Sequence, residues 1–149
     1  MNQSKLVKYY KVAQFMANEF SKDPNTKVGC ILLSKDSLHI LCLGFNGFPR
    51  KVLETDTRWQ RPTKYTYVCH AETNCLYNAC RSGVCTLESI AICTLFPCID
   101  CCKGLIQAGI SKIVSPIPDY NNEKWGEQFK CSMEMFNEVG IEIELIENV

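Results

Sequence analysis

The 149-residue sequence predicts one α/β domain with three layers, helix, sheet and helix, around a single mostly parallel sheet. Two β-rich apolar runs, residues 28–33 and 40–45, come first and are separated by a turn-forming Ser-Lys-Asp-Ser segment. Helical and strand patterns then alternate through the second half of the chain. Because no repeat, linker or low-complexity tract divides residues 1–149, we expect a single domain.

Each expected element follows from a local pattern. Apolar residues spaced three and four apart predict an amphipathic helix over residues 6–20, which Asp23-Pro24-Asn25 ends. Residues 47–67 hold two prolines, many charges and little periodicity, so they predict a long loop. The later elements are expected as a helix over 71–80, a strand over 89–95, a helix from Pro97 to Gly109, a strand over 112–115, a helix over 123–139 ended by Gly140, and a half-exposed strand from residue 141.

Composition excludes several classes of protein. Sixteen basic and sixteen acidic residues give zero net charge, so the chain lacks a field for holding a nucleic acid polymer. No apolar run approaches 18 residues and no signal-peptide core is present, so we expect no membrane span and no secretion signal. Eleven cysteines, an odd number, then indicate a reducing cytoplasmic setting in which most thiols only pack.

Four residues form a pattern with chemical meaning. His70 lies two residues before Glu72 at an expected helix start, and Cys98 and Cys101 lie within a Pro-Cys-x-x-Cys at another. One imidazole and two thiolates supply three of the four positions of tetrahedral Zn²⁺ and leave one for water. Glu72 is then free to act as a proton shuttle. The His-x-Glu and Pro-Cys-x-x-Cys pattern is the signature of zinc nucleobase deaminases.

Other interpretations of the same residues remain. A Cys-x-x-Cys alone also suits a structural zinc or a redox pair. Cys98 as a nucleophile activated by His70 is an alternative, although it leaves Cys101 and Glu72 without roles.

Four motifs in the order of a known family extend the pattern. They are Asp23-Pro24-Asn25-Thr26-Lys27-Val28-Gly29, Gly44-Phe45-Asn46-Gly47-Phe48-Pro49, residues 63–74 around His70, and residues 95–110 around the two cysteines. In these motifs the chain resembles the deoxycytidylate (dCMP) deaminases, a branch of the cytidine deaminase superfamily. The resemblance implies a cytidine-deaminase-like fold with a five-stranded mixed sheet.

The resemblance also implies a reaction and a set of site residues. The reaction is hydrolytic deamination of dCMP to dUMP and ammonia, with Zn²⁺ held by His70, Cys98 and Cys101. Glu72 moves protons to cytosine N3 and to the leaving amine. The remaining implied roles are stabilisation of the intermediate by the backbone N–H of Ala71, a sugar hydrogen bond from Asn46, a lining for the sugar-phosphate end from Asn25, Thr26 and Lys27, and closure of the pocket by Tyr120.

The family is commonly hexameric and allosteric, activated by dCTP and inhibited by dTTP with Mg²⁺. Residues 50–64 carry five basic and two acidic side chains, and Arg50 and Lys51 are candidates for binding phosphate there. The alternative is a solvated loop without a ligand. Whether dCTP is substrate, activator or neither stays open.

Two other functions compete with a small-molecule nucleotide deaminase. One is a zinc deaminase acting on bases in RNA or DNA, such as a tRNA adenosine deaminase, which needs an electropositive channel for a strand. The other is a zinc-binding regulator without catalytic activity. Zero net charge and the two N-terminal motifs favour the free nucleotide.

Overall fold

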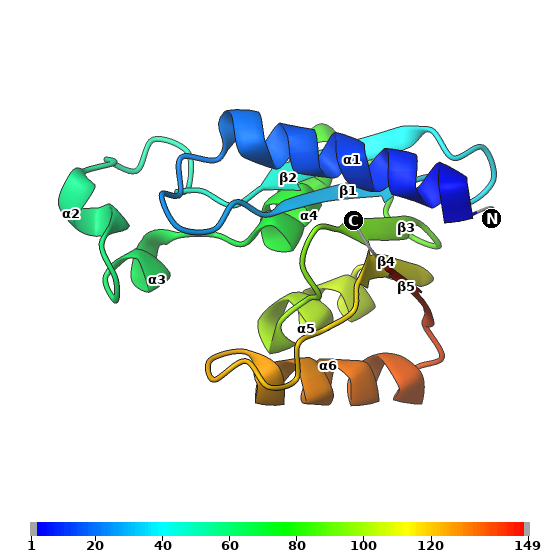
Figure 1. Cartoon of the computed structure of the whole chain (residues 1–149). Coiled ribbons are helices and arrows are strands. Elements are labelled where there is room, and N and C mark those ends of the chain that lie inside the picture. Colours follow the sequence, from blue (N-terminus) through cyan, green and yellow to red (C-terminus); the bar gives the residue numbers. More distant parts are fainter. Residues whose placement is uncertain (1–2, 148–149) are drawn as a thin grey trace.

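The computed structural model describes residues 3–147 and arranges them as a helix-covered sheet (Figure 1). In chain order the elements are α1 Gln3–Phe20, β1 Gly29–Leu33, β2 Ile40–Phe45, α2 Asp56–Trp59, α3 Lys64–Tyr67, α4 Ala71–Ser82, β3 Ile90–Cys93, α5 Ile99–Gln107, β4 Lys112–Pro116, α6 Gly126–Glu138 and β5 Glu142–Ile146. Within these residues, no helix combines the length and the apolar character needed to cross a membrane.

The five strands form one sheet in the order β2-β1-β3-β4-β5. β1 pairs antiparallel with both β2 and β3, while β3–β4 and β4–β5 are parallel. The sheet is therefore mixed, as the family resemblance implied. The expectation of a mostly parallel sheet was too strong, because β1 turns back against β3 as well as against β2.

The two faces of the sheet bury separate clusters, which makes the three layers. Alternate residues of β1 point to opposite sides: Ile31 and Leu33 pack with Leu6 and Ala13 of α1. The other face packs against α4, α5 and α6 through a cluster that includes Cys30, Leu32, Cys75, Leu105, Phe129 and Phe136. The predicted three-layer domain is thus confirmed.

Residues 47–67, predicted as a long loop, contain the short helices α2 and α3. The Thr55 side chain accepts a hydrogen bond from the Arg58 N–H and caps α2. The Phe48 ring stacks on the Tyr67 ring, with centroids 5.7 Å apart, and meets the Trp59 ring at a tilt, with centroids 4.5 Å apart. The two ring contacts join residues more than ten positions apart, so the local periodicity of the sequence cannot predict them.

Two expected helix starts shift for local reasons. Cys98 is the N-cap of α5, so Pro97 precedes the cap instead of occupying the first helical position. The last helix begins at Gly126 and not at residue 123, because the Asn122 side chain accepts hydrogen bonds from the N–H groups of Lys124 and Trp125 and holds them in a turn.

Gly44 in β2 lets α4 lie unusually close to the sheet. A Cβ placed there would lie 2.5 Å from the Ala71 carbonyl oxygen and 2.8 Å from the Cys75 Cα. Both neighbours are backbone atoms of α4, so they cannot move aside alone. Gly44 therefore fixes the position of the helix that begins at the predicted zinc ligand His70.

Replacing Gly44 with Ala is expected to push α4 away from β2 and to lower the free energy of unfolding by about 1–3 kcal/mol, the usual cost of overpacking. Urea unfolding followed by circular dichroism measures it. Gly47→Ala is the matched control, since a Cβ there meets nothing within 4 Å. Equal stability of the two variants would contradict the close-approach interpretation.

Candidate active site

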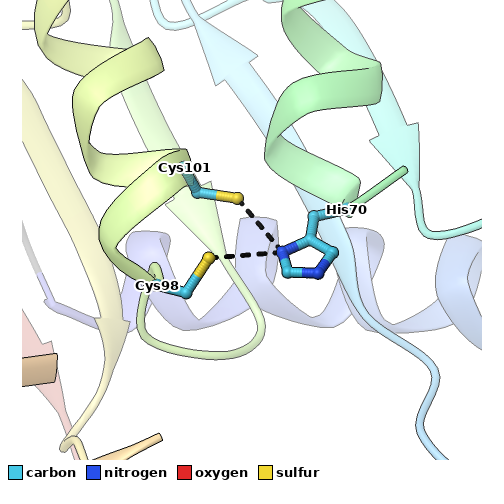
Figure 2. Close-up of side chains that lie close together, drawn as sticks. All are labelled: His70, Cys98 and Cys101. Carbon is cyan, nitrogen blue, oxygen red and sulfur yellow. Dashed lines mark hydrogen bonds between the residues drawn. The ribbon is translucent and has the colours of Figure 1, made fainter. Parts of the chain in front are cut away.

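His70, Cys98 and Cys101 converge where two helices begin. His70 is the N-cap of α4 and Cys98 is the N-cap of α5, with Cys101 in the first turn of α5. The Nδ1 atom of His70 lies 3.3 Å from the Cys98 sulfur and 3.4 Å from the Cys101 sulfur. Figure 2 shows both sulfurs directed at this one ring nitrogen, while the other ring nitrogen points away.

The spacing of the three donors fits Zn²⁺. Tetrahedral zinc with Zn–S near 2.3 Å and Zn–N near 2.0–2.1 Å places sulfur and nitrogen about 3.6 Å apart. The two observed sulfur–nitrogen distances are close to that value, and all three ligand atoms lie within 4.8 Å of one another. Three protein ligands leave one position open, as in catalytic zinc sites.

The two thiols differ in acidity: the pKa of Cys98 is lowered and that of Cys101 is raised. Interaction with the neighbouring Cys101 thiol lowers the pKa of the Cys98 thiol to about 4, and the same interaction raises the pKa of Cys101. A site that stabilises one thiolate before any metal arrives suits a soft cation, since zinc binds the deprotonated form.

Glu72 lies beside the cluster without the geometry of a ligand. Its side chain is buried, and its Oε2 accepts a hydrogen bond from the Cys101 sulfur at 3.4 Å. Burial raises the pKa of the Glu72 carboxyl above its ordinary value. A raised pKa makes the carboxylate a stronger base, which suits a group that takes a proton from water and returns it.

The ligands have supporting contacts of their own. The Thr73 hydroxyl lies 3.7 Å from the Cys101 sulfur. The His70 ring meets the Trp125 ring edge to face, with centroids 5.9 Å apart at 78°. Such contacts fix ligand orientation, so the site is held from α4, from α5 and from the segment before α6.

His70, Cys98 and the buried Glu72 line a pocket, and their end of it is called the floor. Its apolar lining includes the buried Phe96 and Phe129, the partly buried Trp125 and the exposed Leu95, and the rest of the lining is largely polar or charged. The residues that line it on the polar side are Asp23, Thr26, Asn46, Arg61, Lys64, Tyr65, Glu72 and Lys124. Aromatic walls beside the floor and polar side chains at the rim suit a planar base attached to a polar group.

A buried ion pair shapes the polar wall. The Lys64 Nζ lies 2.8 Å from both carboxylate oxygens of Asp23, and both side chains are at most 5% exposed. Burial raises the pKa of Asp23, but hydrogen bonds from Lys64 and from the N–H groups of Asn25 and Thr26 outweigh it, so the pKa lies below its ordinary value. The Asp23 carboxyl therefore stays ionised at neutral pH.

Asn46 ties this pair to the neighbouring loop. Its amide nitrogen donates to Asp23 Oδ2 and to the Thr26 carbonyl, and its oxygen accepts from the Ser21 hydroxyl and the Val28 N–H. All four hydrogen-bonding positions of the amide are thus used within the protein. The sugar hydrogen bond expected of Asn46 stays a prediction.

The other residues expected to bind substrate are distributed differently. Ala71 and Thr26 line the pocket. Asn25 lies beside it, with its Oδ1 accepting from Lys64 at 3.3 Å. The Lys27 Nζ donates to the Asn18 carbonyl at the end of α1, and the exposed Tyr120 is not among the pocket-lining residues.

Arg50 and Lys51, the candidates for binding phosphate, lie outside the pocket on an exposed turn. The Arg50 guanidinium donates to the Asn78 side chain on α4. Their assignment stays a prediction, and the pocket rim presents other cations.

Sequence reasoning did not assign Arg61, Tyr65, Lys124 and Trp125 to the site. Arg61 and Tyr65 belong to the segment treated as a loop, and Trp125 was assigned only to a helix pattern. The one available signal was the net positive charge of residues 50–64, which marks the segment but not the side chain that faces the pocket.

A cluster that could hold zinc through three ligands, with an adjacent carboxyl on a mixed sheet flanked by helices, is the arrangement of a metal-dependent hydrolase. Comparison with known proteins specifies the family. The family model for the cytidine and deoxycytidylate deaminase zinc-binding region matches residues 3–116. The chain belongs to this deaminase family.

Individual relatives support the assignment. A deoxycytidylate deaminase from Homo sapiens is 31% identical over 141 residues, covering 89% of this chain and 75% of that protein. An Aliivibrio fischeri protein named as an uncharacterized deaminase in the luxG 3′ region is 34% identical over 139 residues, 91% and 89% of the two chains. The dCMP deaminase of cyanophage S-TIM5, solved with dCMP and dUMP, has a TM-score of 0.77 at 26% identity and covers 98% and 99%.

Replacing Cys101 with Ala is expected to abolish stoichiometric zinc binding, because it removes one of three protein ligands. Zinc content measured by plasma mass spectrometry gives the result. Cys102→Ala is the matched control: Cys102 is equally buried but its sulfur faces the Ser132 carbonyl. Zinc retained by the Cys101 variant would show that the metal is held elsewhere.

Replacing Asp23 with Asn leaves the Lys64 ammonium buried without a counter-charge and should cost about 3–5 kcal/mol of unfolding free energy. Because the folded pKa of Asp23 is lowered, its stabilisation is complete above the ordinary value of 3.8 and is lost as the pH falls below it. In urea unfolding from pH 7 to pH 3, the gap in unfolding free energy between the two proteins should be constant near neutral pH and begin to narrow below about pH 3.8. A gap that persists undiminished at pH 3 would contradict the ion-pair explanation.

Proposed function

We propose that this deaminase catalyses the hydrolysis of dCMP to dUMP and ammonia. The observation that carries the proposal is the three-ligand cluster with the buried Glu72 at the floor of a pocket whose rim carries cations. The likeness to the cyanophage dCMP deaminase over 98% of the chain supports the same substrate.

The reaction replaces the exocyclic amine at cytosine C4 with oxygen from water. His70, Cys98 and Cys101 would hold Zn²⁺. When bound, zinc supplies a Lewis acid that lowers the pKa of a water molecule from about 15.7 toward neutrality. The protein must then move protons and hold the base flat against the floor.

Glu72 moves the protons. It takes one proton from the attacking water and delivers it to N3 as the C4–O bond forms. It then takes the second proton from the new C4 hydroxyl and gives it to the amine as the C4–N4 bond breaks, which leaves the C4 carbonyl of dUMP and ammonia. Its burial keeps the carboxyl away from bulk solvent, and its raised pKa makes the carboxylate a stronger base toward the attacking water. The N–H of Ala71, at the start of α4, has no carbonyl one turn earlier in the helix and can donate to the developing oxygen charge.

The walls orient the base. Phe96, Trp125 and Phe129 surround the floor, and aromatic faces pack on a planar pyrimidine and exclude bulk water. The sugar then lies against Thr26 and Asn46, next to the Asp23–Lys64 pair.

We also propose the regulation and assembly implied by the family resemblance: dCTP and dTTP, the latter with Mg²⁺, bind at the exposed basic turn of Arg50 and Lys51 in a homo-hexamer. The turn lies outside the pocket, and the link from Arg50 to Asn78 connects it to α4, the helix that carries Glu72.

A substrate panel tests the function. Zinc-loaded protein is incubated with dCMP, deoxycytidine, dCTP and a cytosine-containing oligonucleotide, each with and without dCTP or dTTP plus Mg²⁺, and ammonia release is followed. Release from dCMP well above the other compounds is expected. Turnover of the oligonucleotide alone would favour a deaminase of nucleic acid bases, and zinc binding without any turnover would favour a regulator.

Replacing Glu72 with Gln should retain zinc and fold but lower kcat for dCMP by about 10²–10⁴-fold, the usual contribution of a general acid–base group. Zinc content and ammonia release are measured on the same sample. Glu127→Gln, an exposed position on α6, is the control and should behave as the unaltered protein. Zinc lost in proportion to activity would mean that Glu72 is needed for the metal and not as the shuttle.

A further inference from the structure

The pocket rim carries three cations, and only two of them are available to a ligand. The Lys64 ammonium donates to both oxygens of Asp23 and to Asn25 Oδ1, which uses its three N–H groups. Its charge is balanced by Asp23, and its side chain is 5% exposed. Lys64 therefore builds the wall and does not bind an anion.

Arg61 and Lys124 differ from Lys64 in this respect. Both are exposed, both line the pocket, and among residues 3–147 neither forms an ion pair with a carboxylate. They supply two positive charges at the rim. A nucleotide monophosphate carries about −1.5 to −2 at neutral pH, so the two charges match it.

Aromatic rings hold Lys124 in place without neutralising it. Its Nζ lies 2.9 Å from the centre of the Tyr65 ring and 4.4 Å from the centre of the Trp125 ring. Ring faces attract an ammonium group but carry no net charge. The Lys64 Nζ lies 5.6 Å from the centre of the same Tyr65 ring. The nearby Lys124 lowers the pKa of the Tyr65 hydroxyl, and the charges of Arg61 and Lys64 act in the same direction.

The rim and the floor are linked by one residue. Trp125 follows Lys124 in the chain and its ring packs against the ring of His70. A base seated beside His70 thus directs its sugar-phosphate end toward the rim. The cations reach this rim from two distant segments, one containing α3 and the other preceding α6, on the same side of the molecule (Figure 1).

We propose that Lys124, with Arg61, selects the substrate by its 5′-phosphate and so makes the enzyme prefer a nucleoside monophosphate over the free nucleoside. This inference rests on the proposed deaminase function. Lys124 acts on binding of the phosphate and takes no part in the proton transfers at the floor.

The test compares Lys124→Gln with the unaltered zinc-loaded protein. The ratio of kcat/KM for dCMP to that for deoxycytidine should fall about 10- to 100-fold, mainly through KM, because a charge-assisted contact to phosphate is lost. Lys124→Arg should restore most of the ratio, and Arg61→Gln should lower it in the same direction. Lys130→Gln, an exposed lysine on α6 outside the pocket, is the matched control.

Binding of dUMP and deoxyuridine by calorimetry provides a second measurement that does not depend on turnover. Lys124→Gln should weaken dUMP binding about 10- to 100-fold relative to deoxyuridine. An unchanged ratio in both experiments, or equal losses for nucleotide and nucleoside, would overturn the role of Lys124. An unaltered protein that binds dUMP but deaminates neither substrate would instead contradict the proposed function and leave the phosphate contact supported.

Discussion

The meeting of two helix starts beyond the end of β3 is the constraint on which the site depends. His70 caps α4 and Cys98 caps α5, so the relative placement of these helices sets the distance between imidazole and thiol. α4 is held against the sheet by the backbone contact at Gly44, and α5 follows β3 through a turn of only a few residues. Zinc–ligand distances vary by only a few tenths of an ångström, so the two helices must be placed accurately. The close contact of α4 with Gly44 provides one such fixed point.

A second constraint acts on the opposite wall of the pocket. The Asp23–Lys64 pair is buried, and Asn46 joins Asp23 to the Thr26 carbonyl and to β1 through Val28. Three motifs that are distant in the sequence thereby form one polar wall. Burying polar and charged groups costs free energy unless each has a hydrogen-bonding or ionic partner, so the loss of one of these residues destabilises the others.

The sequence predicted those features that depend on short-range spacing. His70 with Glu72, and Cys98 with Cys101, lie within one helical turn of each other, so a local pattern was enough to predict their chemistry. The strand pair and the order of the other helices and strands were predicted in the same way, but the short helices α2 and α3 were not. The direction of β1 relative to β3 was not predicted, because it depends on how the chain crosses between them. The contact of Lys124 with Tyr65 joins positions 59 residues apart, so no local pattern reveals it.

The central claim is that one nitrogen and two sulfur atoms of this chain hold a catalytic zinc ion. X-ray absorption at the zinc edge of the purified protein measures that ligand set directly. The structure predicts two sulfur atoms at about 2.3 Å and two nitrogen or oxygen atoms at about 2.0–2.1 Å, one of them from solvent. A shell of four sulfur atoms, drawn from the other cysteines, would contradict the account.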